Sequence, residues 1–342
     1  MDFEKNYIVE KLTELCNTPS VTGNTANIQR KIKKEIKDLG VEVYANEKGG
    51  LIATIPGEKE SAITVSAHID TLGAMVKEIK GNGRLAISLI GGFDFNSIET
   101  ENCTIHSCKG DYTGSFVLTK GSVHVHGGDT AKQTRDKNSI EIRVDENINT
   151  KEDAEKLGIA VGDFVSFDAR VFKTKSGYIK SRHLDDKAGV AIILQTIKTL
   201  KKQNITPVNT INFFISNYEE VGHGSSFIPQ NTHELVAVDM GVVGDGQQGS
   251  ENCVSICAKD SSGPYDLDMR KSLVKICLEK KIPYKVDIFP FYGSDASAAL
   301  AAGNNIRVAL IGPGVDNSHS YERTHVDGLM ATYNLLYHYL TR

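Results

Sequence analysis

The sequence has no run of about 18 or more apolar residues, and this absence excludes an ordinary transmembrane helix. Its first residues, MDFEKNYIVEKLTELC, lack the basic start, the apolar middle and the small-residue cleavage site of a signal peptide. We therefore expect no membrane association and a cytoplasmic location.

The chain also lacks a Cys-x-x-Cys pair and a concentrated basic face. Its six cysteines include Cys103 and Cys108, which could form half of a metal site with Cys253 and Cys257. Those spacings are unusual, so we expect reduced structural thiols. The net charge is −4 with both signs mixed along the chain, whereas nucleic-acid binding usually needs clustered positive charge. No nucleic-acid partner is expected.

Apolar periodicity indicates an α/β organisation at both ends of the chain. The length of 342 residues favours two domains, and 40% apolar residues are enough for a sizeable core. Apolar positions at helical spacing predict helices at 6–17, 25–39, 186–202, 266–280 and 328–340, with Thr22 or Asn24 capping the second. Short β-branched runs predict buried parallel strands at 51–55, 62–67, 211–216, 235–240 and 308–312.

The middle of the chain has a different pattern. Residues 76–177 contain short alternating runs separated by glycines, which predict strands of a small all-β unit, with one helix at 149–158. We therefore expect an α/β fold in which residues 1–75 and 178–342 form a catalytic domain with a mostly parallel sheet. An inserted β-rich, barrel-like domain would occupy residues 76–177.

Histidines and carboxylates follow the predicted strands. In open α/β sheets, ligands bind at the carboxyl ends of the strands. The residues at those ends are His68 and Asp70, Glu219 and Glu220, Asp239, and His319. A further pair, Asp185 and Asp186, opens a predicted helix, where a carboxylate can face a metal or only cap the helix.

These side chains form a nitrogen-and-oxygen ligand set without thiolate, which suits Zn²⁺, Co²⁺ or Mn²⁺. Two histidines and three carboxylates exceed the ligands of one catalytic zinc. They suit two divalent ions about 3.5–4 Å apart that share a carboxylate and a water. One residue of the Glu219–Glu220 pair can bind metal while the other takes a proton from the water. Asp70 is placed to hold the second N–H of the His68 imidazole.

Seven motifs spread along nearly the whole chain carry a family resemblance. They are PSVTG (19–23), SAHIDTLGAMV (66–76), EKLGIAVGDFV (155–165), SRHLDDKAGVA (181–191), NYEEVGHGS (217–225), VAVDMG (236–241) and YGSDASA (292–298). With them the sequence resembles the M42 family of metallo-aminopeptidases, within the wider group of co-catalytic zinc peptidases.

The resemblance implies a role for each member of the set. It implies that the β-rich insert is a dimerisation domain and that the chain forms a homo-oligomer. Its implied metal ligands are His68, Asp185 as the bridge, Glu220, Asp239 and His319, with Glu219 as general base and Asp70 orienting His68.

The chain departs from the family pattern at Asn24, where glutamate is common, and around the last ligand. The tail Asn-Ser-His-Ser-Tyr-Glu leaves His325 as an alternative to His319, and it is similar to a divergent branch associated with compatible-solute peptides and amides. Arg323 could bind a substrate carboxylate or form a surface salt bridge. Asp295 could receive the free amino group of a substrate or cap a helix.

We expect a metallo-aminopeptidase that removes N-terminal residues from short peptides, using a metal-bridging water activated by Glu219. The alternative is a deacylase or amidase with the same two ions, acting on small acylated amino acids or dipeptide amides, compatible solutes included. A non-catalytic scaffold would be expected to lose part of the set. A glycosidase would leave the histidines unexplained.

Overall fold

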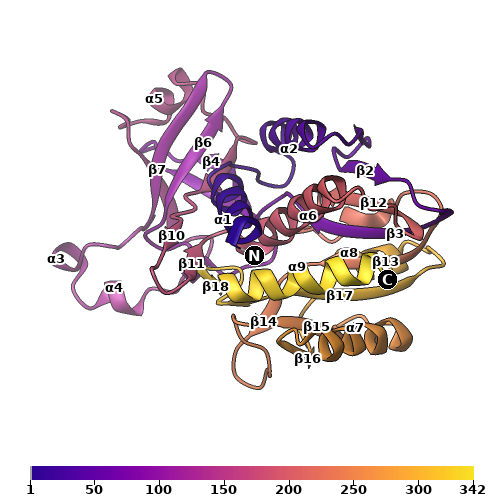
Figure 1. Cartoon of the computed structure of the whole chain (residues 1–342). Helices are drawn as coiled ribbons and strands as arrows, with labels where there is room; N and C mark the ends of the chain where they lie inside the picture. Colours follow the sequence, from indigo (N-terminus) through magenta and orange to yellow (C-terminus); the bar gives the residue numbers. More distant parts are fainter. Residues whose placement is uncertain (1) are drawn as a thin grey trace. The chain divides into compact units, whose positions relative to one another are not determined.

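The computed structural model describes residues 2–342, which form two compact units (Figure 1). The first, here called the sheet unit, comprises residues 2–20, Thr25–Asp70 and Arg170–Arg342. The second, here called the barrel unit, comprises Val21–Asn24 and Thr71–Ala169. The barrel unit therefore starts and ends several residues before the 76–177 expected for the insert, and it includes a short earlier segment.

A 12-stranded sheet forms the centre of the sheet unit. Its main path runs β1-β2-β12-β3-β13-β17-β18-β11-β10, with β14 and β15 also pairing with β17, and β16 with β15. The central strands β12, β3, β13 and β17 are mutually parallel, which confirms the expected mostly parallel α/β sheet. The strands are β1 (Val43–Ala45), β2 (Leu51–Ile55), β3 (Lys59–His68), β10 (Phe172–Lys173), β11 (Tyr178–Ser181), β12 (Asn209–Ser216), β13 (Thr232–Val238), β14 (Gly241–Val243), β15 (Val254–Lys259), β16 (Tyr284–Ile288), β17 (Arg307–Asp316) and β18 (Glu322–His325).

One predicted parallel strand is antiparallel. Strand β2, predicted at 51–55, pairs antiparallel with β12 and with β1. Only residues 56–58 connect β2 to β3, and a parallel crossover needs about a dozen residues or more. The prediction of its direction was wrong because a buried apolar run does not encode strand direction.

The helices of the sheet unit bury their apolar faces. Helix α6 is almost entirely buried, packs on β3 and contacts both α1 and α9 (Figure 1). Helix α2 buries Ile28, Ile32 and Ile36, which share one face at a spacing of four residues. Its N-cap is Thr25, so the expected capping by Thr22 or Asn24 was wrong. The helices are α1 (Asp2–Cys16), α2 (Ala26–Asp38), α6 (Leu184–Lys202), η2 (Gly224–Ser226), α7 (Leu267–Lys280), α8 (Asp295–Ala301) and α9 (Val326–Leu340).

The barrel unit is a closed six-stranded barrel in the order β4-β5-β8-β7-β6-β9, which confirms the β-rich, barrel-like expectation. Its interior is filled by aliphatic side chains and by Phe116 and Phe167, which meet edge to face. Helix α5 is capped by Thr150, whose side chain accepts the Asp153 N–H in a capping box. The elements are β4 (Gly73–Ile79), β5 (Leu85–Ile90), η1 (Phe95–Ser97), β6 (Asn102–Ser107), β7 (Gly110–Leu118), α3 (Val123–His126), α4 (Asp129–Lys132), β8 (Ile140–Val144), α5 (Lys151–Lys156) and β9 (Phe164–Phe167).

Two expectations concern the chain as a whole. Within residues 2–342, no helix is long and apolar enough to span a membrane. All six cysteines are free thiols, as expected, and five of them are buried.

Candidate active site

The parallel strands bring the predicted residues to one edge of the sheet. Strand β3 ends at His68, β13 is followed directly by Asp239, and the turn after β12 carries Glu219 and Glu220. Because these strands are parallel neighbours, their carboxyl ends meet at the same edge. The residues that follow them are therefore neighbours in space although they are far apart in the chain.

Asp185 lies between the two histidines. One carboxylate oxygen is 3.1 Å from His68 Nε2, and the other is 3.4 Å from His319 Nε2. Glu220 Oε2 is 3.8 Å from His319 Nε2, and Glu219 Oε2 is 3.6 Å from His68 Nε2. The Asp185 carboxylate thus directs one oxygen toward His68 and the other toward His319.

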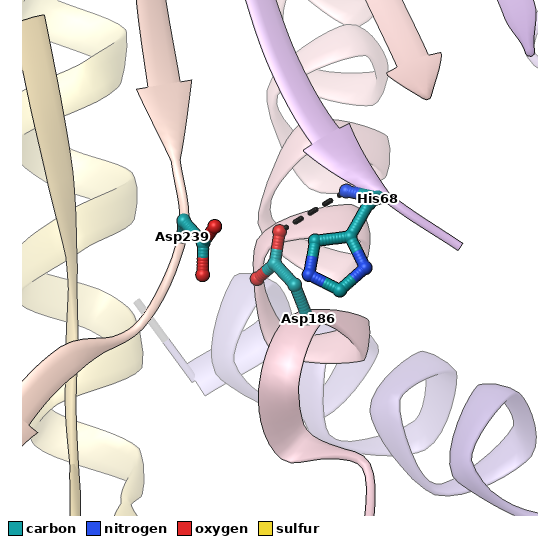
Figure 2. Close-up of side chains that lie close together, drawn as sticks. All are labelled: His68, Asp186 and Asp239. Carbon is teal, nitrogen blue, oxygen red and sulfur yellow. Dashed lines mark hydrogen bonds between the residues drawn. The ribbon is translucent and has the colours of Figure 1, made fainter. Parts of the chain in front are cut away.

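Asp186 also approaches this cluster. His68, Asp186 and Asp239 converge so that one ligand atom from each lies within 4.8 Å of the others (Figure 2). However, Asp186 Oδ2 accepts the main-chain N–H of His68 at 3.2 Å, and Oδ1 accepts that of Gly189 at 2.9 Å. Asp186 therefore ties the first turns of α6 to the end of β3, while Asp185 faces the imidazoles.

The contact of Asp70 with His68 differs from the sequence expectation. His68 Nδ1 lies 2.9 Å from the main-chain carbonyl of Asp70, whereas the Asp70 carboxylate is 3.8 Å away. The carboxylate instead accepts the N–H groups of Glu219 at 3.1 Å and Glu220 at 3.3 Å. Asp70 thus orients the imidazole through its backbone, and its side chain holds the turn that carries the two glutamates.

The geometry separates the two histidines near the end of the chain. His319 points its Nε2 at Asp185 and Glu220. His325 is the N-cap of α9, where Nδ1 accepts the Asp327 N–H at 3.1 Å and Nε2–H donates to the Ser176 carbonyl at 2.8 Å. Both ring nitrogens of His325 are therefore engaged away from the cluster.

This difference predicts opposite outcomes for two alanine variants. His319→Ala should weaken divalent metal binding, because it removes a donor beside Asp185. His325→Ala should keep metal binding and lose about 0.5–2 kcal/mol of stability, because it removes a helix cap. Calorimetric titration with metal and thermal unfolding of both variants measure the two effects. Loss of metal from His325→Ala alone would reverse the assignment.

The two residues considered for substrate binding lie in different settings. Asp295 is buried at the start of α8, where its Oδ2 accepts the Ser216 hydroxyl at 2.5 Å. The cap of α8 is Ser294, so Asp295 is not the cap. Arg323 is exposed, pairs with Glu251 at 3.2 Å and stacks on the Tyr178 ring. That surface salt bridge was one of its two expected roles.

Burial and mutual repulsion dominate the electrostatics of the cluster. Burial, with Asp185 nearby, raises the pKa of Glu220 to about 8 and that of Asp239 to about 7. Burial also raises the pKa of Glu219 well above its ordinary value, and Asp239 adds to this while His68 opposes it. Burial alone would raise the pKa of Asp185, but hydrogen bonds with His319 and His68 hold it below its ordinary value.

This donor set fits divalent metal ions. Closely spaced buried carboxylates are costly unless cations neutralise them, and protons do so only in part. A buried lysine beside the cluster, Lys187, directs its ammonium to Ser20 and to the Ile69 carbonyl. Imidazole and carboxylate donors that converge in this way suit ions such as Zn²⁺, Co²⁺ and Mn²⁺.

Sequence reasoning gave no role to Lys187 or Glu322. Glu322 is buried and accepts the main-chain N–H groups of Asp185 and His319. It was visible in the sequence only as a glutamate three positions after His319. Lys187 was visible only as the lysine of the DDKAG motif, with no sign that it would be buried.

Some of the non-glycine residues with positive φ values lie in the segments that carry the cluster. His183, Tyr218 and His319 have left-handed φ values of 69°, 70° and 64°. Such values are uncommon for residues other than glycine and cluster at functional sites. His183 lies two residues before Asp185, and Tyr218 directly precedes Glu219. The surrounding structure therefore holds the cluster-bearing segments in conformations that the free chain disfavours.

Comparison with known proteins agrees with this arrangement. The family model described as M42 glutamyl aminopeptidase matches residues 49–335. A Bacillus subtilis (strain 168) protein named "Putative aminopeptidase YhfE" is 52% identical over 335 residues, covering 97% of this chain and 96% of its own. Peptidases of the matched family are metal-dependent, which accords with the group of His68, Asp186 and Asp239.

Two solved structures show the same fold. The TET aminopeptidase of Thaumarchaeota archaeon SCGC AB-539-E09 has a TM-score of 0.89 at 17% identity, covering 98% of this chain and 96% of its own. The Pyrococcus horikoshii TET1 peptidase, described as assembling into a tetrahedron or a large octahedral shell, has a TM-score of 0.86 at 23% identity, covering 98% and 99%. From the extent of the family match and the identity to the Bacillus protein, the chain belongs to the M42 peptidase family and is an aminopeptidase, a hydrolase of peptide bonds.

Proposed function

We propose that this aminopeptidase removes N-terminal residues from short peptides with two divalent metal ions held by the cluster. The observation that carries the proposal is the position of Asp185, with one oxygen toward His68 and the other toward His319. His68 and Asp239 would hold one ion, Glu220 and His319 the other, and Asp185 would bridge them. Two ions so placed supply Lewis acidity toward the scissile carbonyl and lower the pKa of a shared water.

Glu219 would act as the general base. Its carboxylate lies 3.6 Å from His68 Nε2, so it faces the same space as the ligands without being needed as one. A carboxyl group whose pKa is raised by burial is a better proton acceptor than an exposed one. Glu219 would take a proton from the attacking water and pass it to the amine that leaves.

Asp295 would recognise the free amino group of the substrate. Asp295 is buried, and it lies close enough to Glu219 for its negative charge to help raise the pKa of Glu219. It therefore places negative charge beside the proposed reacting centre. A buried carboxylate favours a protonated amine, whereas an acylated nitrogen gains nothing from it. This arrangement favours an aminopeptidase over a deacylase.

Asp295→Asn tests this recognition. Asparagine keeps the shape and can still accept the Ser216 hydroxyl, but it loses the charge. We expect kcat/KM for a free-amino peptide to fall about 10-fold to 100-fold, the range for a hydrogen bond to a charged group. An analogue that lacks only the amino group should be cleaved equally by both proteins. An equal loss on both substrates would make the role of Asp295 structural.

We also propose a homo-oligomer in the cytoplasm, with the barrel unit as the dimerisation domain. The similar Pyrococcus horikoshii peptidase is described as assembling into large particles, and its chain aligns with this one over 98% of the length. Light scattering of the intact protein measures the assembly. A monomer at micromolar concentration would contradict this part of the proposal.

The reaction itself is tested with matched substrates. Short peptides with a free amino terminus are compared with the same peptides carrying an N-acetyl group, with added Co²⁺, Zn²⁺ or Mn²⁺ and without metal. Metal-dependent release of the first residue from the free-amino set is expected. Removal of only the acetyl group from the blocked set would transfer the function to a deacylase.

A further inference from the structure

Three buried carboxylates beside the cluster share one pattern of contacts. Each accepts two main-chain N–H groups, at least one of which belongs to a residue of the cluster. Asp70 holds Glu219 and Glu220, and Asp186 holds His68 and Gly189. The third member, Glu322, differs because it joins two segments that no regular element connects directly.

Glu322 begins strand β18 and is 2% exposed. Its Oε2 accepts the Asp185 N–H at 3.2 Å, and its Oε1 accepts the His319 N–H at 3.1 Å. Asp185 lies at the start of α6, whereas His319 lies in the loop between β17 and β18. One carboxylate therefore spans the gap between these two segments.

The pairing of β18 explains why Glu322 can act as a fixed point. In the sheet, Glu322 stands opposite Ser181, the last residue of β11, which leads through residues 182–183 into α6. The loop that carries His319 leads directly into β18, and His319 lies three residues before Glu322. The loop is not regular structure, and His319 itself has a left-handed φ of 64°. Glu322 accepts the N–H of His319 in this loop, and the neighbouring Ser318 hydroxyl donates to Asp185 Oδ2 at 3.4 Å.

We infer that Glu322 is a positioning residue that sets the separation of Asp185 and His319 through their main chains, and that tight binding of the metal ion on the His319 side requires it. The inference rests on the proposed function, since it assumes that these two residues are ligands. An ionised carboxylate offers an acceptor to each N–H. Glutamine offers one acceptor and turns an NH₂ group toward the other N–H, so one of the two segments loses its anchor.

The test is a titration of the metal-free protein with Co²⁺, which measures the number of ions and both dissociation constants. The parent protein should bind two ions. Glu322→Gln should weaken the ion held by Glu220 and His319 about 10-fold to 100-fold, the usual range for partners of ligands, and the other ion less. Glu322→Asp, which keeps the charge but is one methylene shorter, should give an intermediate loss if the glutamine variant does not fold.

Thr324→Val is the matched control. Thr324 lies in the same strand, is fully buried, and donates its hydroxyl to the Gly314 carbonyl at 2.7 Å, away from the cluster. It should keep both dissociation constants of the parent. Unchanged constants in Glu322→Gln, or an equal loss in Thr324→Val, would overturn the inference.

The proposed function can fail separately. If the parent protein binds fewer than two Co²⁺ ions, the two-ion proposal fails, and the inference is judged on crystal structures of the metal-free proteins. Glu322→Gln should then move the His319 loop away from Asp185, while Thr324→Val leaves it in place. An unmoved loop in Glu322→Gln overturns the positioning role.

Discussion

Glu219→Gln is expected to lower the turnover of a free-amino peptide about 10³-fold while both metal ions remain bound. Glutamine has nearly the shape of glutamate but cannot accept a proton, and general-base catalysis contributes about 10²–10⁴-fold. In the proposed site Glu219 would not be needed as a ligand, because Glu220 and His319 would serve on one side of Asp185 and His68 on the other. Turnover and metal content of the same preparation give both quantities.

The control for this variant is Glu60→Gln, which changes an exposed glutamate at the start of β3. It should match the parent in both measurements. If Glu219→Gln keeps full turnover, Glu219 is not the base. If it loses metal together with turnover, Glu219 is a ligand and the roles within the glutamate pair must be exchanged.

Asp185→Asn is expected to remove at least one of the two ions and to reduce turnover by more than about 10³-fold. The asparagine side chain carries no charge and has one oxygen, so it cannot face both His68 and His319 as a carboxylate does. Loss of the ions removes several kcal/mol of transition-state stabilisation, and each 1.4 kcal/mol is about tenfold in rate.

The neighbouring variant Asp186→Asn separates this prediction from general damage. Asp186 is at least as buried as Asp185, but its oxygens accept the main-chain N–H groups of His68 and Gly189. Its asparagine variant should keep two ions and lose stability, because one N–H loses its acceptor. The reverse result, with metal lost from Asp186→Asn and kept in Asp185→Asn, would make Asp186 the ligand.

Periodicity predicted most of the fold because the apolar pattern reports burial directly. The helices at 186–202 and 328–340 appear as α6 and α9, and the four central parallel strands appear where buried β-branched runs were found. Direction is a different property. Strand β2 has the composition of a parallel strand and runs antiparallel, because the three-residue link to β3 leaves no room for a crossover.

The candidate site could be predicted as a set, because parallel strands collect their carboxyl ends at one edge. Spacing alone does not say whether Asp185 or Asp186 faces the two imidazoles, since that depends on the backbone conformation at the start of α6. The contact between Asp70 and His68 could not be predicted for a related reason. The sequence does not indicate whether the main-chain carbonyl or the carboxylate of Asp70 contacts His68 Nδ1. The conformation of the turn after β3 decides this.

Glu322 shows a further limit of sequence reasoning. Its role depends on the pairing of β18 with β11, two short strands that are far apart in the chain and carry no strong apolar pattern. Without that pairing, a glutamate near His319 looks like a solvated residue. Contacts through the main chain leave no side-chain motif that could have indicated them.

The central claim is that the cluster around Asp185 binds two divalent ions that together drive removal of N-terminal residues. The most direct measurement strips the protein with a chelator and adds Co²⁺ in steps, following bound metal and release of the first residue from a short free-amino peptide. The account predicts negligible release without metal and full release as the ratio approaches two ions per chain. Full release from the stripped protein, or activity that is complete at one ion per chain, would contradict it.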